Sequence, residues 1–265
     1  MLIAHLSDLH LLASAAPTCG VAPMAENLAR CVASVNRLSA RPDLVLITGD
    51  VTQDGTLEQA EHAASILSEL AMPFYLVPGN HDRRDTLWEV FSGTACPERQ
   101  DRFCSYVIDG YPVRIIALDS TREGQPGGEL CPARARWLAA RLREDQGRPT
   151  IIAMHHPPMK LGVPETDIDG FVGADRLQRM VAGHDNIERI LCGHIHLHTH
   201  ARWAGTVVTT CPSPGMALAY ELESGADSGF FSSEPAYLLH HRPGQGALVT
   251  HLRNVNPGTG PHRFS

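Results

Sequence analysis

Short apolar runs alternate with longer segments of helical periodicity along the first three quarters of the chain. The short runs predict strands at residues 2–6, 43–48, 74–78, 113–119, 150–155 and 187–192. Between them, residues 24–40, 56–70 and 131–143 place apolar side chains three or four positions apart, which predicts amphipathic helices. Strands that alternate with helices are typical of parallel βαβ units, whose sheets are buried on both faces. The pattern therefore predicts an α/β fold.

The pattern changes after residue 206. Runs at 206–210, 236–241 and 247–252 predict strands without helices between them, hence an antiparallel end to the fold. Turn-forming residues cluster at 211–215 and 223–229. Because no linker or internal repeat interrupts the chain, we expect one domain over residues 1–265, with a loop subdomain at about 213–235.

Composition and charge restrict the class of protein. The 265 residues are 43% hydrophobic and 19% charged, with a formal net charge of −7, as in ordinary globular proteins. This acidic balance argues against a nucleic-acid polymer as partner, since such binding needs a basic surface. No apolar run approaches the ~18 residues of a membrane span, and the first residues lack the features of a secretory signal. We therefore expect no membrane partner and a cytoplasmic protein whose seven cysteines are mostly reduced.

Polar side chains follow five of the predicted strands. In chain order the motifs read SDLH, GDVTQDG, PGNHD, MHHPP and CGHIH. Ligands of parallel α/β sheets bind outside the carboxyl ends of the strands, so these motifs should meet at one edge. The side chains concerned are Asp8, His10, Asp50, Asn80, His81, Asp82, His155, His156, His194 and His196.

Each motif alone also has a structural explanation. Aspartate caps helices, GNHD suits a tight turn, proline can fix the HHPP loop, and GHIH can be a surface loop. Five such motifs at five strand ends favour one shared site over five coincidences. Aspartate, histidine and asparagine suit a dication such as Mn, Fe, Co or Zn. The candidates exceed the ligands that one ion needs, which indicates two ions bridged by a carboxylate.

In this order, the blocks D-x-H, G-D, G-N-H-D, H and G-H-x-H resemble the calcineurin-like metallophosphoesterase superfamily over residues 8–196. The resemblance implies a four-layer αββα sandwich of two mixed β-sheets, with a dinuclear metal site at the sheet edge. Two divalent or mixed-valence ions would be bridged by Asp50. The implied ligands are Asp8, His10, Asp50 and His196 for one ion, and Asp50, Asn80, His155 and His194 for the other.

The resemblance also assigns roles beside the metals. His81 matches an outer-sphere histidine that stabilises the transition state or protonates the leaving group. Asp82 would orient His81 or its loop. His156 should point away from the metals, because adjacent side chains of an extended chain face opposite ways. His198 and His200 match no position of the family and are expected to be ordinary strand residues.

Within the superfamily, the motifs look most like the bacterial class III cyclic nucleotide phosphodiesterases and the related glycerophosphodiesterases. This implies hydrolysis of a small phosphodiester by in-line attack of a metal-bridging hydroxide, with 3′,5′-cyclic nucleotides as the first expectation. Glycerophosphodiester or broad-specificity phosphodiesterase activity is the alternative. A non-catalytic, metal-free scaffold is a remote alternative that a missing ligand would mark, and every ligand is present here.

The roles of some residues outside the ligand set stay open at this point. Arg83 and Arg84 either line the substrate site or begin a helix and face solvent. His5, inside the first strand, is expected to be a core histidine. The segment 216–231 resembles the cap or dimer-contact region of the family, and would contact a nucleobase, a partner subunit or neither. Relatives that assemble through their C-terminal part imply a homo-oligomer.

Overall fold

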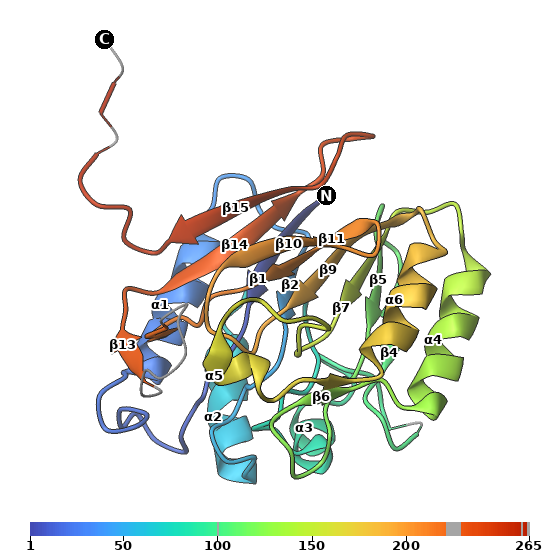
Figure 1. Cartoon of the computed structure of the whole chain (residues 1–265). Helices are drawn as coiled ribbons and strands as arrows, with labels where there is room; N and C mark the ends of the chain where they lie inside the picture. Colours follow the sequence, from blue (N-terminus) through green and yellow to red (C-terminus); the bar gives the residue numbers. More distant parts are fainter. Residues whose placement is uncertain (100, 221–228, 261, 264–265) are drawn as a thin grey trace.

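Two mixed β-sheets form the centre of the protein in the computed structural model (Figure 1), which describes all residues except 100, 221–228, 261 and 264–265. The first sheet has the order β15 (Val249–Asn254), β14 (Ala236–His241), β1 (Leu2–Leu6), β2 (Leu44–Ile47) and β3 (Phe74–Leu76). The second has the order β10 (Thr199–Trp203), β11 (Thr206–Thr210), β9 (Ile187–Cys192), β7 (Thr150–Ala153), β5 (Arg114–Ala117) and β4 (Tyr106–Ile108).

The strand directions agree only in part with the prediction of parallel strands followed by an antiparallel end. β1, β2 and β3 are parallel, as are β5, β7, β9 and β11. β14 and β15 pair antiparallel at one edge of the first sheet, as expected. The expectation was wrong for β11, which is parallel to β9. The chain first turns back through β10 and so returns in its original direction.

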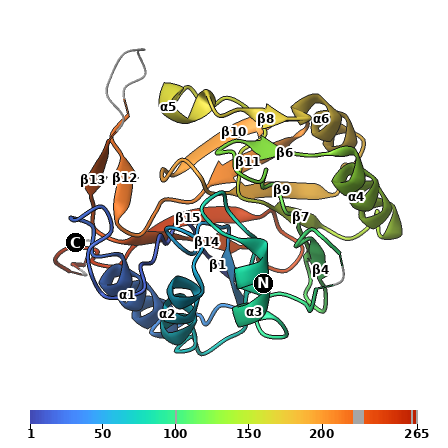
Figure 2. The ribbon, with the colours of Figure 1, turned by 90° about the horizontal axis from the view of Figure 1, so that it is seen from below.

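Helices cover the outer face of each sheet. α1 (Met24–Asn36), α2 (Leu57–Leu67) and α3 (Arg84–Phe91) lie on one side, and α4 (Pro132–Glu144) and α6 (Ala174–Ala182) on the other (Figure 2). On the first sheet, Leu28 and Ala63 pack with Ile47. On the second, Leu138 packs with Ile152.

A third apolar cluster lies between the two sheets. It joins Ile3 and Leu46 of the first sheet to Ile151 and Leu191 of the second. With helices packed on both outer faces, this interface makes a four-layer αββα sandwich and confirms the predicted fold class. None of the described helices has the length and apolar character needed to cross a membrane.

Several short elements were not predicted. α5 (Pro164–Asp167), β6 (Gly128–Glu129) and β8 (Phe171–Val172) are too short to show a period, and β6 pairs only with β8. The predicted helix at 24–40 ends earlier, at Asn36. Leu38 still packs on the core beyond the helix end, so its apolar position extended the apparent pattern.

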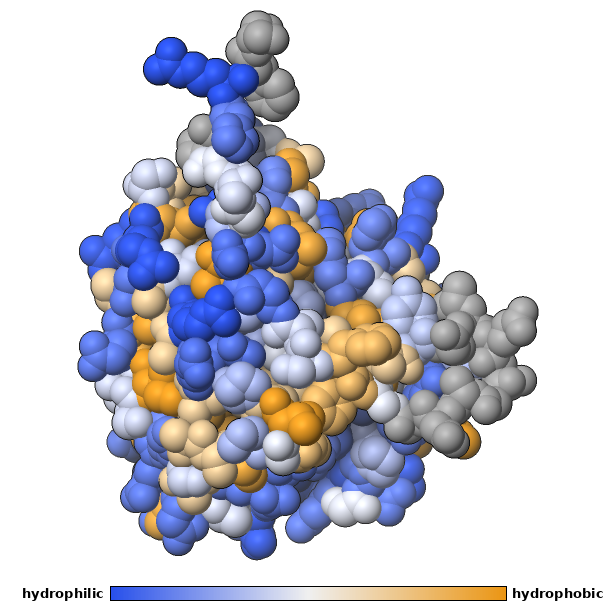
Figure 3. Space-filling model, turned by 90° about the vertical axis from the view of Figure 1, so that its left-hand side faces the viewer, coloured by the Kyte–Doolittle hydropathy of each residue, from blue (hydrophilic) through white to orange (hydrophobic). Residues whose placement is uncertain are grey.

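A hairpin outside the two large sheets occupies the segment where we expected a loop subdomain. β12 (Met216–Leu218) pairs with β13 (Phe230–Ser232), and Met216 packs against Met24 at the start of α1. Phe231 is 68% exposed. The face with α1 and this hairpin carries hydrophobic residues among hydrophilic ones (Figure 3). Most of the predicted 223–229 turn lies outside the described residues, and the single-domain organisation stays a prediction.

Candidate dinuclear metal centre

The carboxyl ends of five strands bring the predicted ligands together. β1 leads to Asp8 and His10, β2 to Asp50, β3 to Asn80, β7 to His155, and β9 to His194 and His196. The two sheets therefore contribute to one site, which neither could build alone. Among described residues, four clusters of His and Asp side chains have ligand atoms within 4.8 Å of one another, and all four lie here.

The first ligand set is centred on two facing imidazoles. Nε2 of His10 lies 3.0 Å from Nε2 of His196. Nε2 of His196 is 3.6 Å from Oδ1 of Asp8, and Nε2 of His10 is 3.6 Å from Oδ2 of Asp50. These four residues are the ones expected to hold the first ion.

The second ligand set shares Asp50 with the first. Oδ1 of Asn80 lies 3.0 Å from Nε2 of His155 and 3.1 Å from Nδ1 of His194. Oδ2 of Asp50 is 3.3 Å from Nε2 of His155. Because that same oxygen also faces His10, it stands between the two sets, as a bridging ligand must.

The hydrogen bonds of the outer ring nitrogens show that a cation fits both sets. Nδ1 of His155 donates to the carbonyl oxygen of Thr48 at 2.7 Å, and Nδ1 of His196 donates to that of Met216 at 2.8 Å. In the neutral rings both Nε2 atoms then keep a lone pair. Nε2 of His196 faces Nε2 of His10, and Nε2 of His155 faces Oδ1 of Asn80. Buried acceptors that face each other in this way need a cation between them. Ligand atoms about 2.0–2.2 Å from such an ion would be spaced much as these are, so the set fits a borderline dication.

Two further residues touch ligand side chains, and the sequence did not identify them. Oε1 of Gln53 is 3.0 Å from Nδ1 of His10. Oδ2 of Asp169, which precedes β8, is 3.5 Å from Nε2 of His194. Partners of this kind fix the orientation and basicity of a histidine ligand. Gln53 stands close to Asp50 in GDVTQDG, but no motif marked Asp169.

The backbone is strained at the ligands. Seven described non-glycine residues have positive φ, and five of them are Asp8 (55°), His10 (45°), Asp50 (49°), His194 (72°) and His196 (55°). The left-handed region is unfavourable for such residues and persists only where the surroundings enforce it. In this backbone conformation the five side chains are directed into one small volume.

Three glycines beside the candidate ligands leave no room for a side chain. A Cβ on Gly79 would overlap Oδ1 and the backbone nitrogen of Asp50, and one on Gly193 would overlap Oγ of Ser7. Gly49 has a φ of +95°, and a Cβ there would lie 2.6 Å from Nδ1 of His155. The glycines of the GD, PGNHD and CGHIH motifs thus let the strand ends approach closely.

The electrostatics of the site follow from burial and close pairing. Burial alone would raise the pKa of Asp50, but the charge and hydrogen bond of His155, together with the charge of His10, hold it well below the usual value. Burial alone would lower the pKa of His155, but the Asp50 carboxylate raises it to about 9. A proton on His155 thus takes the place of a cation. Burial lowers the pKa of His10 to about 3 despite Asp50.

His81 and Asp82 lie in the same loop but have different surroundings. Nδ1 of His81 donates to the carbonyl oxygen of Gln53 at 2.8 Å, and no hydrogen bond to another described residue uses its Nε2. The carboxylate of Asp82 accepts from the backbone nitrogens of Val51, Thr52 and Gly79 at 2.9–3.1 Å, and from Oγ1 of Thr52 at 2.7 Å. Asp82 therefore ties the loop after β3 to the loop after β2.

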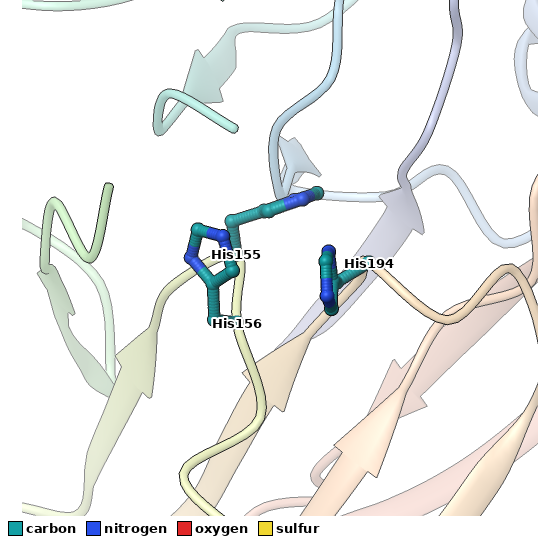
Figure 4. A group of neighbouring side chains, drawn as sticks. All are labelled: His155, His156 and His194. Atoms are coloured by element: carbon teal, nitrogen blue, oxygen red, sulfur yellow. The ribbon is translucent and has the colours of Figure 1, made fainter. Parts of the chain in front are cut away.

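Three further histidines of the motif region lie outside the two ligand sets. His156 lies beside the ligands, its ring 4.8 Å from that of His194 (Figure 4). Its Nδ1 bonds Oγ of Ser120 at 2.9 Å, and its Nε2 donates to the carbonyl oxygen of Pro126 at 3.0 Å. His198 and His200 are exposed and belong to none of the four clusters in the described chain.

His5 is a buried core histidine, as expected. Its Nδ1 lies 3.0 Å from Nε2 of His240, and its Nε2 lies 2.8 Å from Oγ1 of Thr48. Both ring nitrogens therefore have partners inside the core, and neither faces the ligand sets.

Two pockets open beside the ligands. One, called the apolar pocket below, has a volume of about 270 Å³, and its walls include His156, Pro157, Pro158, Met159, Phe171, His194 and Ile195. The other, called the arginine pocket, has a volume of about 570 Å³, and its walls include Asn80, His81, Arg83, Arg84, Arg99, Arg102 and Arg122.

The two arginines after GNHD differ in their exposure. Arg83 precedes α3 and is exposed at the arginine pocket. Arg84 begins α3 and also lines this pocket, but its side chain turns inward and does not face solvent. Its Nε donates to Oδ2 of buried Asp119 at 2.5 Å, and its Nη2 donates to Oδ1 of Asp119 at 3.1 Å. Asp119, at the end of β5, attracts the guanidinium inward.

The chain is similar to several known proteins. A family model described as calcineurin-like phosphoesterase matches residues 1–198. A probable glycerophosphodiester phosphodiesterase of Arcobacter nitrofigilis is 30% identical over 265 residues, covering 100% of this chain and 97% of that protein. A probable cyclic nucleotide phosphodiesterase of Synechococcus is 33% identical over 226 residues, covering 81% and 80%. A crystal structure of a dimetal phosphatase from Danio rerio shares the fold, with a TM-score of 0.64 at 14% identity over 94% of this chain and 98% of that one.

Proposed function

Because the chain belongs to the calcineurin-like phosphoesterase family, we propose that it hydrolyses small phosphodiesters with two metal ions, 3′,5′-cyclic nucleotides being the preferred substrates. It is a metal-dependent phosphoric diester hydrolase. The observation that carries the proposal is the position of Oδ2 of Asp50, 3.3 Å from Nε2 of His155 and 3.6 Å from Nε2 of His10, between the two proposed ligand sets.

Asp8, His10, Asp50 and His196 would hold one ion, and Asp50, Asn80, His155 and His194 the other. The donor set fits Mn, Fe, Co or Zn. When bound, two such ions lower the pKa of a water molecule and stabilise charge on the attacking and leaving oxygens of a phosphoryl displacement.

His81 is the group of this chain that we assign to the reacting phosphate. The carbonyl of Gln53 holds Nδ1 in the protonated form, which fixes the ring and leaves Nε2 for the substrate. As an imidazolium, His81 would donate to a phosphoryl oxygen or protonate the leaving alkoxide. Asp82 contributes indirectly, since its four hydrogen bonds position the loop that carries His81.

The apolar pocket supports a nucleotide as substrate. Pro157, Met159 and Phe171 present carbon surface next to His194, one of the ligands. A nucleobase can stack on such a surface, and this pocket of about 270 Å³ is large enough for one. A glycerophosphodiester is the second candidate, favoured by the alignment of the whole chain with the Arcobacter protein of that name.

A competition experiment tests the substrate. The Mn-loaded protein would be given 3′,5′-cyclic AMP and glycerophosphoethanolamine in one tube, and phosphorus NMR would follow both. We expect the cyclic nucleotide to disappear first. Faster loss of the glycerophosphodiester would instead establish the second candidate. Absence of hydrolysis of both, with no chelator-sensitive hydrolysis of an activated diester, would contradict the proposed function altogether.

Two expectations about the setting of the enzyme are kept as proposals. All seven cysteines are free, which supports a cytoplasmic location. Self-association at the β12–β13 hairpin, where Phe231 is exposed, is the second proposal. Size-exclusion chromatography with light scattering of the protein and of Phe231→Ser would test the latter.

A further inference from the structure

The arginine pocket contains guanidinium groups that have no carboxylate partner among the described residues. Arg84 is paired with Asp119, and Arg99 is paired with Asp85 at 2.7 Å. Arg83, Arg102 and Arg122 are exposed and form no ion pair with any described residue. All three line a pocket that begins at Asn80 and His81, so the unpaired charge adjoins the reacting centre.

Four carboxylates also lie in the wall of this pocket, but none forms an ion pair with Arg83, Arg102 or Arg122. Asp85 is paired with Arg99, and the carboxylate of Asp82 accepts four hydrogen bonds from the loop after β2 and from Gly79. Asp54 accepts from Nε2 of Gln59 at 2.8 Å. Exposed Glu123 forms no ion pair with any described residue. Arg83, Arg102 and Arg122 therefore keep N–H donors that an anion can occupy.

A cyclic nucleotide leaves this pocket without a role. Both of its ester oxygens belong to one ribose, so it has a single arm, and the apolar pocket beside His194 can receive that arm. A linear diester has two arms. The second arm would extend from the phosphorus past Asn80 and His81 toward Arg102 and Arg122.

We infer that the arginine pocket binds a second phosphoryl group, carried by one arm of a linear nucleotide diester. The inference rests on the proposed function and adds a substrate class to the same site. Guanidinium groups bind phosphate through paired N–H donors and keep their charge at any physiological pH. Three of them, Arg83, Arg102 and Arg122, suit a terminal phosphate dianion better than a single carboxylate.

A matched pair of chromogenic diesters tests the inference by catalysis. One is the 4-nitrophenyl ester of thymidine 5′-phosphate, and the other is the same ester with an added 3′-phosphate. We expect kcat/KM to be about tenfold higher with the 3′-phosphate. In Arg102→Gln and Arg122→Gln the ratio of the two values should fall toward one. Arg202→Gln, an exposed site on edge strand β10, is the control and should keep the ratio.

Binding to the metal-free protein provides a second readout that needs no turnover. Thymidine 3′,5′-bisphosphate should bind about tenfold more tightly than thymidine 5′-phosphate in calorimetry, and Arg102→Gln should abolish the difference. A ratio near one in both experiments overturns the inference, even if the shorter ester is hydrolysed. Inorganic phosphate that binds as tightly as the bisphosphate also overturns it, because the pocket would then be an anion site unconnected to a nucleotide arm. Failure to hydrolyse either ester with metals loaded counts against the proposed function instead, and the binding ratio still decides the inference.

Discussion

Oδ2 of Asp50 lies 3.3 Å from Nε2 of His155, and this contact joins the two sheets at the metal centre. Asp50 follows β2 of the first sheet, and His155 follows β7 of the second. The pair is almost completely buried, and without metal the proton shared by its members substitutes for a cation. The candidate site therefore lies at the edge where the two sheets meet, and this contact between two candidate ligands links the sheets there.

Removal of the Asp50 carboxylate, the proposed bridge between the two ions, should abolish turnover. Asp50→Ala takes one ligand from each set, so we expect kcat to fall by at least about a hundredfold and the metal content to drop below two ions per chain. Activity on an activated diester and elemental analysis measure the two effects, and circular dichroism checks the fold. Asp185→Ala, at an exposed position, is the control. Rates close to normal with saturating metal would show that Asp50 is not the bridge.

His81→Ala should separate chemistry from metal binding. Its Nδ1 is held by Gln53 and its Nε2 belongs to neither ligand set, so both ions should stay bound. Loss of a proton donor of this kind lowers the rate by about 10²–10⁴-fold. Single-turnover kinetics and metal analysis on the same sample measure this. A variant that loses an ion would instead make His81 a ligand.

Asp169→Asn should weaken the second ion more than the first. Its carboxylate lies 3.5 Å from Nε2 of His194, and the loss of such a partner typically lowers metal affinity by about 10–100-fold. Mn titration followed by electron paramagnetic resonance resolves the two sites. The exposed Asp175 lies nearby in the sequence, and Asp175→Asn is the control. Equal weakening of both ions, or of neither, would mean that Asp169 does not support His194.

The sequence predicted most of the elements that carry ligands. The strands expected at 2–6, 187–192, 206–210 and 236–241 have the bounds found in the structure, because turn residues border each apolar run. α6 was missed although Leu177, Met180 and Val181 stand at helical spacing, because its nine residues make only about two and a half turns. The motifs also identified residues that the structure brings together at strand ends, because parallel strands within each sheet place those ends at a common edge.

The surroundings of the ligands could not be predicted in the same way. Asp169 reaches His194 across a loop between α5 and β8, and Met216 accepts from His196 although it belongs to the hairpin. Such contacts depend on how loops cross in space, and no period or motif records them. The inward orientation of Arg84 could not be predicted either, because it depends on the buried position of Asp119.

A buried histidine pair should make stability depend on pH. His5 and His240 lie between Thr48 and Thr250 in the core, with Nδ1 of His5 3.0 Å from Nε2 of His240. Burial lowers the pKa of His5 to about 3, with a smaller contribution from His198. Burial, with smaller contributions from His5, Arg189 and His198, holds the pKa of His240 well below 6.5. Both rings are therefore neutral in the folded protein at acidic pH values where the unfolded chain is protonated.

The sign of the effect follows from proton binding. Below pH 6.5 the unfolded chain binds a proton at His5 that the folded chain excludes until about pH 3, so acid favours unfolding in this window. The free energy of unfolding should fall by about 1.4 kcal/mol per pH unit for each such histidine. Urea denaturation of the chelator-treated protein at pH 7.5, 6.5 and 5.5 measures the slope. His5→Asn should reduce the slope by about one histidine's share, whereas His251→Asn, at an exposed position of β15, should leave it unchanged. An identical slope in His5→Asn would mean that His5 is protonated in the folded core.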